Sequence, residues 1–143
     1  MQIFLFNCYF LSGMPIDYKK LDIWHLSYNF TLKVYRLLDM LPASEKDNIS
    51  QQLKRASTSI PIVIAEGSAR RSIKEFRNFV NMAFGSAKEV DVLLMLCKDL
   101  KYIDDDTYDT YHEDIDKLLR KIFLYMKFLD EKVNQKYAVF NKD

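Results

Sequence analysis

The sequence predicts an all-α protein, specifically an antiparallel up-down-up-down four-helix bundle. Apolar residues recur three and four positions apart over four separate segments, which is the periodicity of amphipathic helices. Only three glycines and three prolines occur in 143 residues, so the chain has few places to turn. The 49% of hydrophobic and 29% of charged residues are typical of a globular domain. Short predicted connections place consecutive helices antiparallel.

The first helix is predicted from Tyr18 to about Met40. It ends before Pro42, because a proline disfavours helical geometry in the residue that precedes it. Its apolar stripe consists mainly of Trp24, Tyr28, Thr31, Val34, Tyr35, Leu38 and Leu41.

The second helix is predicted to begin at Ser44, an N-cap residue followed by acidic residues in the first turn. Gly67 is predicted to close it as a C-terminal cap. Pro61 lies inside this helix and removes one backbone hydrogen bond, which predicts a kink between Ser57 and Ile60.

The third helix opens at Ser72, which forms a capping-box pattern with Glu75. Its apolar stripe becomes small from Ala83 to Ala87, and small residues allow another helix to approach closely. The fourth helix is predicted to begin between Asp104 and Thr107 and to fray near Val133.

These helices define a domain over residues 18–133, with an apolar extension over residues 1–17 and a loose tail over residues 134–143. The apolar start is too short to span a membrane, and it lacks the basic region of a signal peptide. One interpretation is that it precedes a natural start at Met14. The alternatives are a membrane-targeting role and a segment that packs on the body or on a neighbouring subunit.

Positive charge gathers around the connection between the second and third helices, although the net charge of the chain is only +1. Such side chains would contact phosphates in a salt-dependent manner. The alternative is a solvated bundle end with pairs such as Arg71–Glu75. The candidate nucleic-acid-binding residues, here called the predicted basic set, are Arg55, Arg70, Arg71, Lys74 and Arg77.

The beginning of the fourth helix is strongly acidic between Asp104 and Asp116. Acidic side chains favour the positive end of a helix dipole, so this run predicts a solvated helix start. A hard-cation site needs convergent oxygen atoms, which consecutive helical positions do not supply.

Five polar residues near the apolar stripes of the second and third helices form a second candidate group. Charged side chains near such stripes need partners if they are buried. They predict a structural polar set, paired within one subunit or across a subunit boundary; the alternative is a group of surface charges. Its members are Arg55, Ser59, Glu66, Ser86 and Glu89.

No catalytic or metal-binding pattern appears in the sequence. His25 and His112 lie on different predicted helices, and neither belongs to a Glu-x-x-His pair. Cys8 and Cys97 form neither a zinc pattern nor a disulfide framework, which fits a reducing cytoplasm. We therefore predict a cytoplasmic protein with no catalytic residue, metal or cofactor, and no membrane partner.

A longer pattern across the second and third helices resembles a known family. It consists of Gln52-Leu53-Lys54-Arg55-Ala56, Ser59-Ile60 and Ile64-Ala65-Glu66-Gly67, then Arg71-Ser72, Glu75-Phe76, Phe79, Ala83, Gly85-Ser86 and Glu89. With Leu21, Trp24, Val34-Tyr35 and Leu41-Pro42 in the first helix, it resembles the four-helix-bundle 23S rRNA intervening-sequence proteins. That family is related to the accessory variability determinant proteins of diversity-generating retroelements.

The resemblance implies a homopentameric ring, association with RNA or DNA, and no known catalytic activity. Two residues depart from the family pattern. Val63 replaces an asparagine, and Lys101 stands where a glycine commonly caps the third helix.

Two main hypotheses follow. The first is a non-enzymatic, ring-forming, nucleic-acid-associated accessory protein. The alternative is a protein–protein interaction scaffold that binds no nucleic acid; a cryptic enzyme is a third, weaker hypothesis. Aromatic residues make up 14% of the chain, more than one small bundle covers, which independently predicts oligomerisation.

Overall fold

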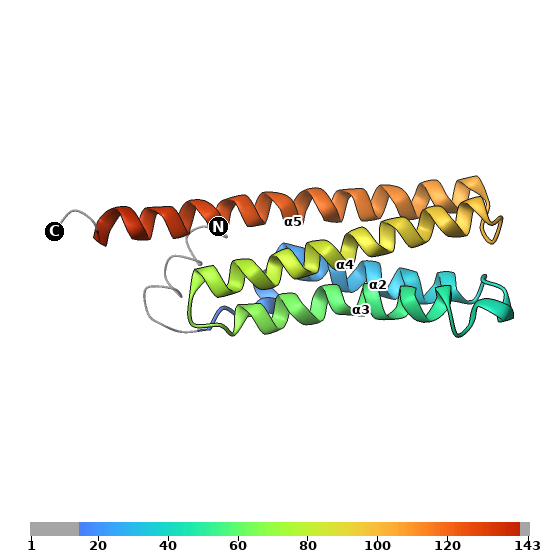
Figure 1. Ribbon diagram of the computed structural model, residues 1–143, viewed down its shortest axis with the longest axis horizontal. Helices are drawn as coiled ribbons and strands as arrows, with labels where there is room; N and C mark the ends of the chain where they lie inside the picture. Colours follow the sequence, from blue (N-terminus) through green and yellow to red (C-terminus); the bar gives the residue numbers. More distant parts are fainter. Residues whose placement is uncertain (1–14, 141–143) are drawn as a thin grey trace.

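The computed structural model describes residues 15–140, including the side chains of residues 15–135. Within this range the chain forms four α-helices and no strand, which confirms the predicted all-α fold (Figure 1). Two short 3-10 turns precede the first two α-helices. The elements are η1 (Tyr18–Lys20), α2 (Asp22–Leu38), η2 (Ala43–Glu45), α3 (Ile49–Ser68), α4 (Ile73–Asp99) and α5 (Asp105–Phe140).

The four helices pack as a bundle in which each helix contacts two neighbours. Helix α3 lies between α2 and α4, and α5 packs against α4 and α2. Figure 1 shows that the chain direction alternates from one helix to the next, and that α5 continues past the α3–α4 turn. No helix in the described part of the chain is long and apolar enough to cross a lipid bilayer.

The predicted stripe of α4 forms the centre of the core. Phe76, Val80, Ala83 and Leu94 are almost wholly buried against the neighbouring helices. Burying an aliphatic or aromatic side chain of this size contributes about 1.5–3 kcal/mol, so the stripe accounts for much of the cohesion of the bundle. The prediction of a small seam is correct only in part, because Gly85 lies on the exposed face.

Along one edge of the α4–α5 contact, every seventh residue of α4 pairs with a side chain of α5. Because seven residues make nearly two helical turns, these side chains share one face of the helix. Three pairs are ionic or hydrogen-bonded and one is aromatic. They are Arg77 with Asp130 (2.9 Å), Phe84 with Phe123 (6.3 Å between ring centroids), Asp91 with His112 (3.2 Å) and Lys98 with Asp105 (3.7 Å).

The prediction that Ser44 caps the second helix is wrong. Ser44 lies in η2, and α3 begins after Asn48, whose φ of −124° and ψ of −102° interrupt the helical path. Glu45 takes over the capping role, since its Oε2 accepts a hydrogen bond from the Ile49 backbone N–H at 3.4 Å. The Tyr102 hydroxyl donates to Oε1 of the same carboxylate at 2.8 Å, so Glu45 also joins the α2–α3 and α4–α5 connections.

Pro61 leaves the carbonyl of Ser57, four residues earlier in α3, without its helical N–H donor. The Thr31 hydroxyl of α2 donates a hydrogen bond to this carbonyl at 2.7 Å. Ser57 and Thr31 are both buried, so water does not replace the missing donor. The proline therefore fixes a cross-link between α2 and α3.

Gly67 is not the predicted helix cap, because it lies inside α3, whose last residue is Ser68 and whose C-terminal cap is Ala69. Its role is to allow close approach of α4. A Cβ atom added at Gly67 would lie 2.5 Å from the Cβ of Phe79 and 2.9 Å from the Cδ2 of Phe76. The Phe79 Cβ is fixed to the α4 backbone, so the helices themselves would have to separate.

The end of α4 forms a Schellman-type cap. The N–H of Tyr102 donates to the carbonyl of Cys97, and the N–H of Lys101 donates to that of Lys98, both at 2.9 Å. Lys101 has a φ of 61°, the left-handed conformation that glycine adopts without strain. Lys101, where the family commonly has glycine, is therefore the capping residue of α4. A side chain in this left-handed conformation lowers the stability by about 1 kcal/mol relative to glycine.

The ends of the described chain bear on the predicted bounds of the domain. Helix α5 continues through Phe140 rather than fraying near Val133, since no glycine or proline interrupts it. Residues 1–14 and 141–143 lie outside the described range, and with them most of the predicted extension and the last residues of the predicted tail. Ile16 is buried, and its N–H donates to the carbonyl of Ser68 at 3.0 Å.

Replacing Thr31 with valine is expected to lower the free energy of unfolding by about 1–3 kcal/mol, because the Ser57 carbonyl loses its donor. Thr31→Ser keeps the hydroxyl and should cost less. Chemical denaturation measures both. In a Pro61→Ala background the new N–H donates to Ser57, so Thr31→Val should cost less there; an equal cost in both backgrounds would contradict the assignment.

Gly67→Ala is expected to destabilise the bundle by about 1–3 kcal/mol, since the added carbon meets the backbone-fixed Cβ of Phe79. Gly85→Ala is the matched control, because nothing lies within 4 Å of a Cβ at that helical position. It should stabilise α4 by about 0.5–1 kcal/mol. Stabilisation by both alanines in thermal or urea unfolding would show that no close approach exists at Gly67.

Candidate nucleic-acid interface

The α3–α4 connection presents three exposed cations within five residues. Ala69 and Arg70 donate backbone hydrogen bonds to the last turn of α3, and Ser72 begins the capping of α4. The Ser72 hydroxyl oxygen accepts from the Glu75 N–H at 3.1 Å, which confirms the Ser72 half of the predicted capping box. The Glu75 carboxylate accepts from the Ser72 hydroxyl at 2.8 Å, in place of the backbone N–H of a full capping box. We call Arg70, Arg71 and Lys74, all exposed, the basic turn.

Arg70 is positioned by an aromatic ring. Its guanidinium carbon lies 4.5 Å from the centroid of the Phe79 ring, within the range of a cation–π interaction. The side chain remains exposed, so this contact orients the charge without burying it. Phe79 thus packs against Gly67 with its Cβ and supports Arg70 with its ring.

Arg77 does not belong to the exposed charge of the basic turn. Its Nε donates to Asp130 Oδ1 at 2.9 Å and its Nη2 donates to Oδ2 at 3.3 Å. This two-point ion pair with α5 neutralises Arg77 within the bundle. The residues around Arg77 in the sequence do not reveal this ion pair, because Asp130 lies fifty-three residues away.

Arg55 is also separate from the basic turn. It is exposed on α3, thirteen residues before the end of that helix at Ser68. At 1.5 Å per residue, this separation is on the order of 20 Å along the helix axis. The structure therefore brings together three members of the predicted basic set and leaves Arg55 and Arg77 outside.

The predicted structural polar set is joined at one point. The Ser86 hydroxyl of α4 donates to the Ser59 hydroxyl oxygen of α3 at 3.1 Å. Arg55, Glu66 and Glu89 are exposed, and none of them forms an ion pair or hydrogen bond through its side chain with another described residue. Among the described residues, the structural link of this set is the serine pair.

An aromatic cluster lies at the same bundle end as the basic turn, and the sequence did not indicate it as a site. The rings of Trp24 and Tyr28 are nearly parallel, with centroids 5.1 Å apart and an interplanar angle of 23°. Tyr18 meets Trp24 edge-on at 4.8 Å. Trp24 and Tyr28 belong to the predicted apolar stripe of the first helix, and they are among the aromatic residues that one bundle was not expected to cover in full; the structure leaves Tyr28 exposed and Trp24 half-buried.

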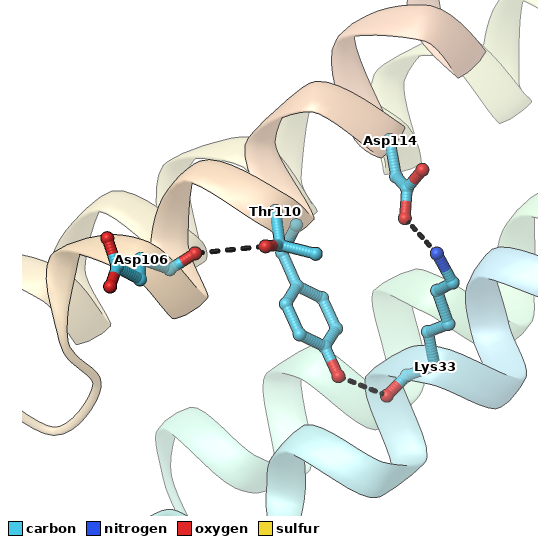
Figure 2. A network of polar contacts seen from close by, with 5 residues as sticks. Lys33, Asp106, Thr110 and Asp114 are labelled. Atoms are coloured by element: carbon cyan, nitrogen blue, oxygen red, sulfur yellow. Dashed lines mark hydrogen bonds and ion pairs between the residues drawn. The ribbon is translucent and has the colours of Figure 1, made fainter.

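The acidic segment at the start of α5 serves capping and packing. Asp104 Oδ1 accepts from the Thr107 N–H at 2.8 Å, and hydrogen bonds from Thr107 lower the pKa of the Asp104 carboxyl. Figure 2 shows Asp114 pointing toward Lys33 of α2, with which it forms an ion pair. The Tyr111 hydroxyl donates to the Lys33 carbonyl at 3.0 Å, which adds a second link between α5 and α2.

The titratable groups of the described chain do not converge on one centre. His25 Nε2 lies 2.6 Å from the Lys19 carbonyl, whereas His112 pairs with Asp91 across the α4–α5 contact. Burial, and to a lesser extent the charge of Glu45, raise the pKa of the Cys97 thiol to about 11, so it is protonated at neutral pH. Among residues 15–135, no three His, Cys, Asp or Glu side chains are grouped to hold a metal ion.

Comparison with known proteins identifies relatives of this fold. The family model described as 23S rRNA-intervening sequence protein matches residues 19–123. A crystal structure of a protein of unknown function from the S23 ribosomal protein family of Bacteroides thetaiotaomicron is similar, with a TM-score of 0.68 and 25% sequence identity. The match covers 73% of this chain and 98% of that chain. No curated protein matches the sequence.

Proposed function

The chain belongs to the 23S rRNA-intervening sequence protein family, and from this premise we propose that it is a non-enzymatic accessory protein that forms a ring and contacts nucleic acid. The contact is made by the basic turn. The observation that carries the proposal is the placement of three exposed cations at one end of the bundle without a carboxylate partner among the described residues.

The surroundings of the basic turn favour phosphate binding. Two carboxylates lie near the basic turn in sequence, Glu66 in the last turn of α3 and Glu75 in the first turn of α4, against its three cations. The Glu75 carboxylate accepts a hydrogen bond from the Ser72 hydroxyl. The cation–π contact with Phe79 fixes the position of the exposed Arg70 guanidinium before any ligand binds. Arginine presents a rigid fork of donors to phosphate oxygens, so two arginines beside a lysine suit a phosphodiester backbone.

Assembly into a homopentamer would multiply this weak, local charge. Three cations in one protomer form a small footprint, whereas a symmetric ring places several copies within reach of one strand. Large apolar side chains are exposed on α2 and α5, including Leu32, Tyr35, Phe123 and Leu124, the last at 60%. Exposed apolar surface of this kind favours a subunit contact.

A protein–protein scaffold is the second candidate function. Val92 and Leu96 are exposed one turn apart on α4, which favours an additional polypeptide partner. The two functions are distinguished by affinity capture after nuclease digestion. Loss of every partner on digestion speaks against the scaffold.

Neutralising the basic turn is expected to weaken binding to nucleic acid. The variant is Arg70→Gln, Arg71→Gln and Lys74→Gln, measured by fluorescence anisotropy with a labelled single strand and its duplex between about 50 and 200 mM salt. In this variant the slope of log affinity against log salt should be smaller in magnitude than in the wild type by about 2–3 for each protomer that contacts the nucleic acid.

The matched control for this variant removes the same charge elsewhere, with Lys46→Gln, Lys117→Gln and Lys121→Gln at exposed positions. It should change the salt slope much less. Wild-type affinity that ignores salt, or equal losses in the two triple variants, would contradict a role for the basic turn.

The oligomeric state is tested by light scattering on a size-exclusion column at micromolar concentration. We expect a mass about five times the 17.0 kDa of one chain. Leu32→Lys and Leu124→Lys place a charge on exposed faces of α2 and α5 without disturbing the core, and a lower mass in either variant identifies the contact face. A wild-type mass of one chain would refute the ring.

A further inference from the structure

An apolar groove lies between α2 and α3, and no residue of the basic turn lines it. It has a volume of about 340 Å³, within the usual range of small-ligand sites. Aromatic residues of η1 and α2 form one wall, and aliphatic residues of α3 form the other. The residues that matter here are Tyr18, Trp24, Tyr28, Pro61, Ile62 and Ala65.

The walls of the groove remain accessible in the protomer. Tyr28 is 46% exposed and Ile62 is 54% exposed. Trp24 and Tyr28 present a nearly parallel aromatic pair, with Tyr18 at the edge. An aromatic wall facing an aliphatic wall suits a flat, apolar-faced ligand that slides between them.

The groove adjoins the basic turn. The hydrogen bond from Ile16 N–H to the Ser68 carbonyl holds η1 against the end of α3. Ala65 in the groove precedes Arg70 by five residues, a distance of about 7 Å along a helix axis. The Lys19 ammonium lies 5.9 Å from the centroid of the Tyr18 ring, and Tyr18 lines the groove. One cation therefore lies beside the aromatic wall of the groove, in addition to those of the basic turn.

We propose that this groove receives an unpaired base of a single-stranded nucleic acid while the basic turn holds the adjacent phosphates. The inference rests on the proposed function and specifies its ligand. Stacking on aromatic side chains beside cations that follow the backbone is the general mode of single-strand binding. A duplex does not offer this ligand, because its bases are already paired and stacked.

The hydroxyl groups in the groove indicate how the base is recognised. The single Thr31 hydroxyl hydrogen is shared between the backbone carbonyls of Ser27 and Ser57, and the Thr58 hydroxyl donates to that of Lys54. Both threonine hydroxyl hydrogens are committed to the protein, so neither threonine donates to the edge of a base, and stacking on the aromatic wall is the main contact. Weak sequence preference is the consequence.

Trp24 makes the proposal directly measurable, because it is the only tryptophan in the chain. Its emission should be quenched when a base stacks in the groove. The probes are oligothymidylate, oligouridylate, an abasic strand of the same length and a duplex. We expect quenching by the first two and none by the abasic strand or the duplex.

Tyr28→Ala supplies the variant test, and Tyr35→Ala is its matched control. The two tyrosines lie seven residues apart on α2 and are equally exposed at 46%, but only Tyr28 lines the groove. Tyr28→Ala should reduce single-strand affinity about 5- to 150-fold, the usual range for losing one stacking partner, and leave duplex affinity unchanged. Tyr35 lies on the face proposed for the subunit contact, so Tyr35→Ala should change single-strand and duplex affinity by the same factor.

Three outcomes overturn the inference. Salt-dependent binding of single strands with unchanged Trp24 emission, and with equal affinity for the abasic strand, removes the base from the groove but leaves the proposed function intact. Failure of every nucleic acid to bind removes both. Emission that changes on dilution or on deletion of residues 1–13, but not with any strand, assigns the groove to a second copy or to the chain's own N-terminal segment.

Discussion

Helices α3 and α4 approach so closely at Gly67 that one added carbon would lie 2.5 Å from the Cβ of Phe79. This contact sets the spacing of the two helices at the end of the bundle where the chain turns between them. The ring of the same phenylalanine lies under Arg70, at 4.5 Å from its guanidinium carbon. Core packing and the presentation of the basic turn therefore depend on the same residue. A change that separates the helices at Gly67 would also move the support of Arg70.

The bundle uses backbone groups as well as side chains to fix how its helices are aligned. Pro61 frees the Ser57 carbonyl in a buried position, where an unsatisfied acceptor costs about 1–3 kcal/mol. One hydroxyl from α2, that of Thr31, satisfies it. Sliding or rotating α2 against α3 would withdraw this donor, whereas purely apolar contacts tolerate small shifts. The proline in α3 therefore helps to specify one arrangement of the helices, which apolar periodicity by itself does not.

The helices were predictable because apolar periodicity and the capping box depend on neighbouring residues in the chain. The errors share a different physical origin. Glycine serves equally as a helix cap or as a point of close approach, and only the residue opposite, Phe79, decides between them at Gly67. Ser44 has the chemistry of a cap, but the conformation of Asn48 delays the helix. Arg77 belonged to the predicted basic set by sequence proximity, and a distant carboxylate pairs with it instead. The excess of aromatic residues predicted exposed aromatic surface, but not a groove, because the opposite wall comes from α3 and the spacing within α2 does not reveal it.

The net charge of +1 does not describe the field at the basic turn. The basic turn and the acidic start of α5 lie at opposite ends of α4, whose 27 residues extend about 40 Å. At physiological salt the screening length is about 8 Å, so exposed charges at one end do not cancel those at the other. Part of the acidic charge is also paired internally, with Lys33 and Lys98. The basic turn has no such partner among the described residues. A phosphate approaching the α3–α4 end therefore meets a local positive field, and a nearly neutral total charge is compatible with nucleic-acid binding there.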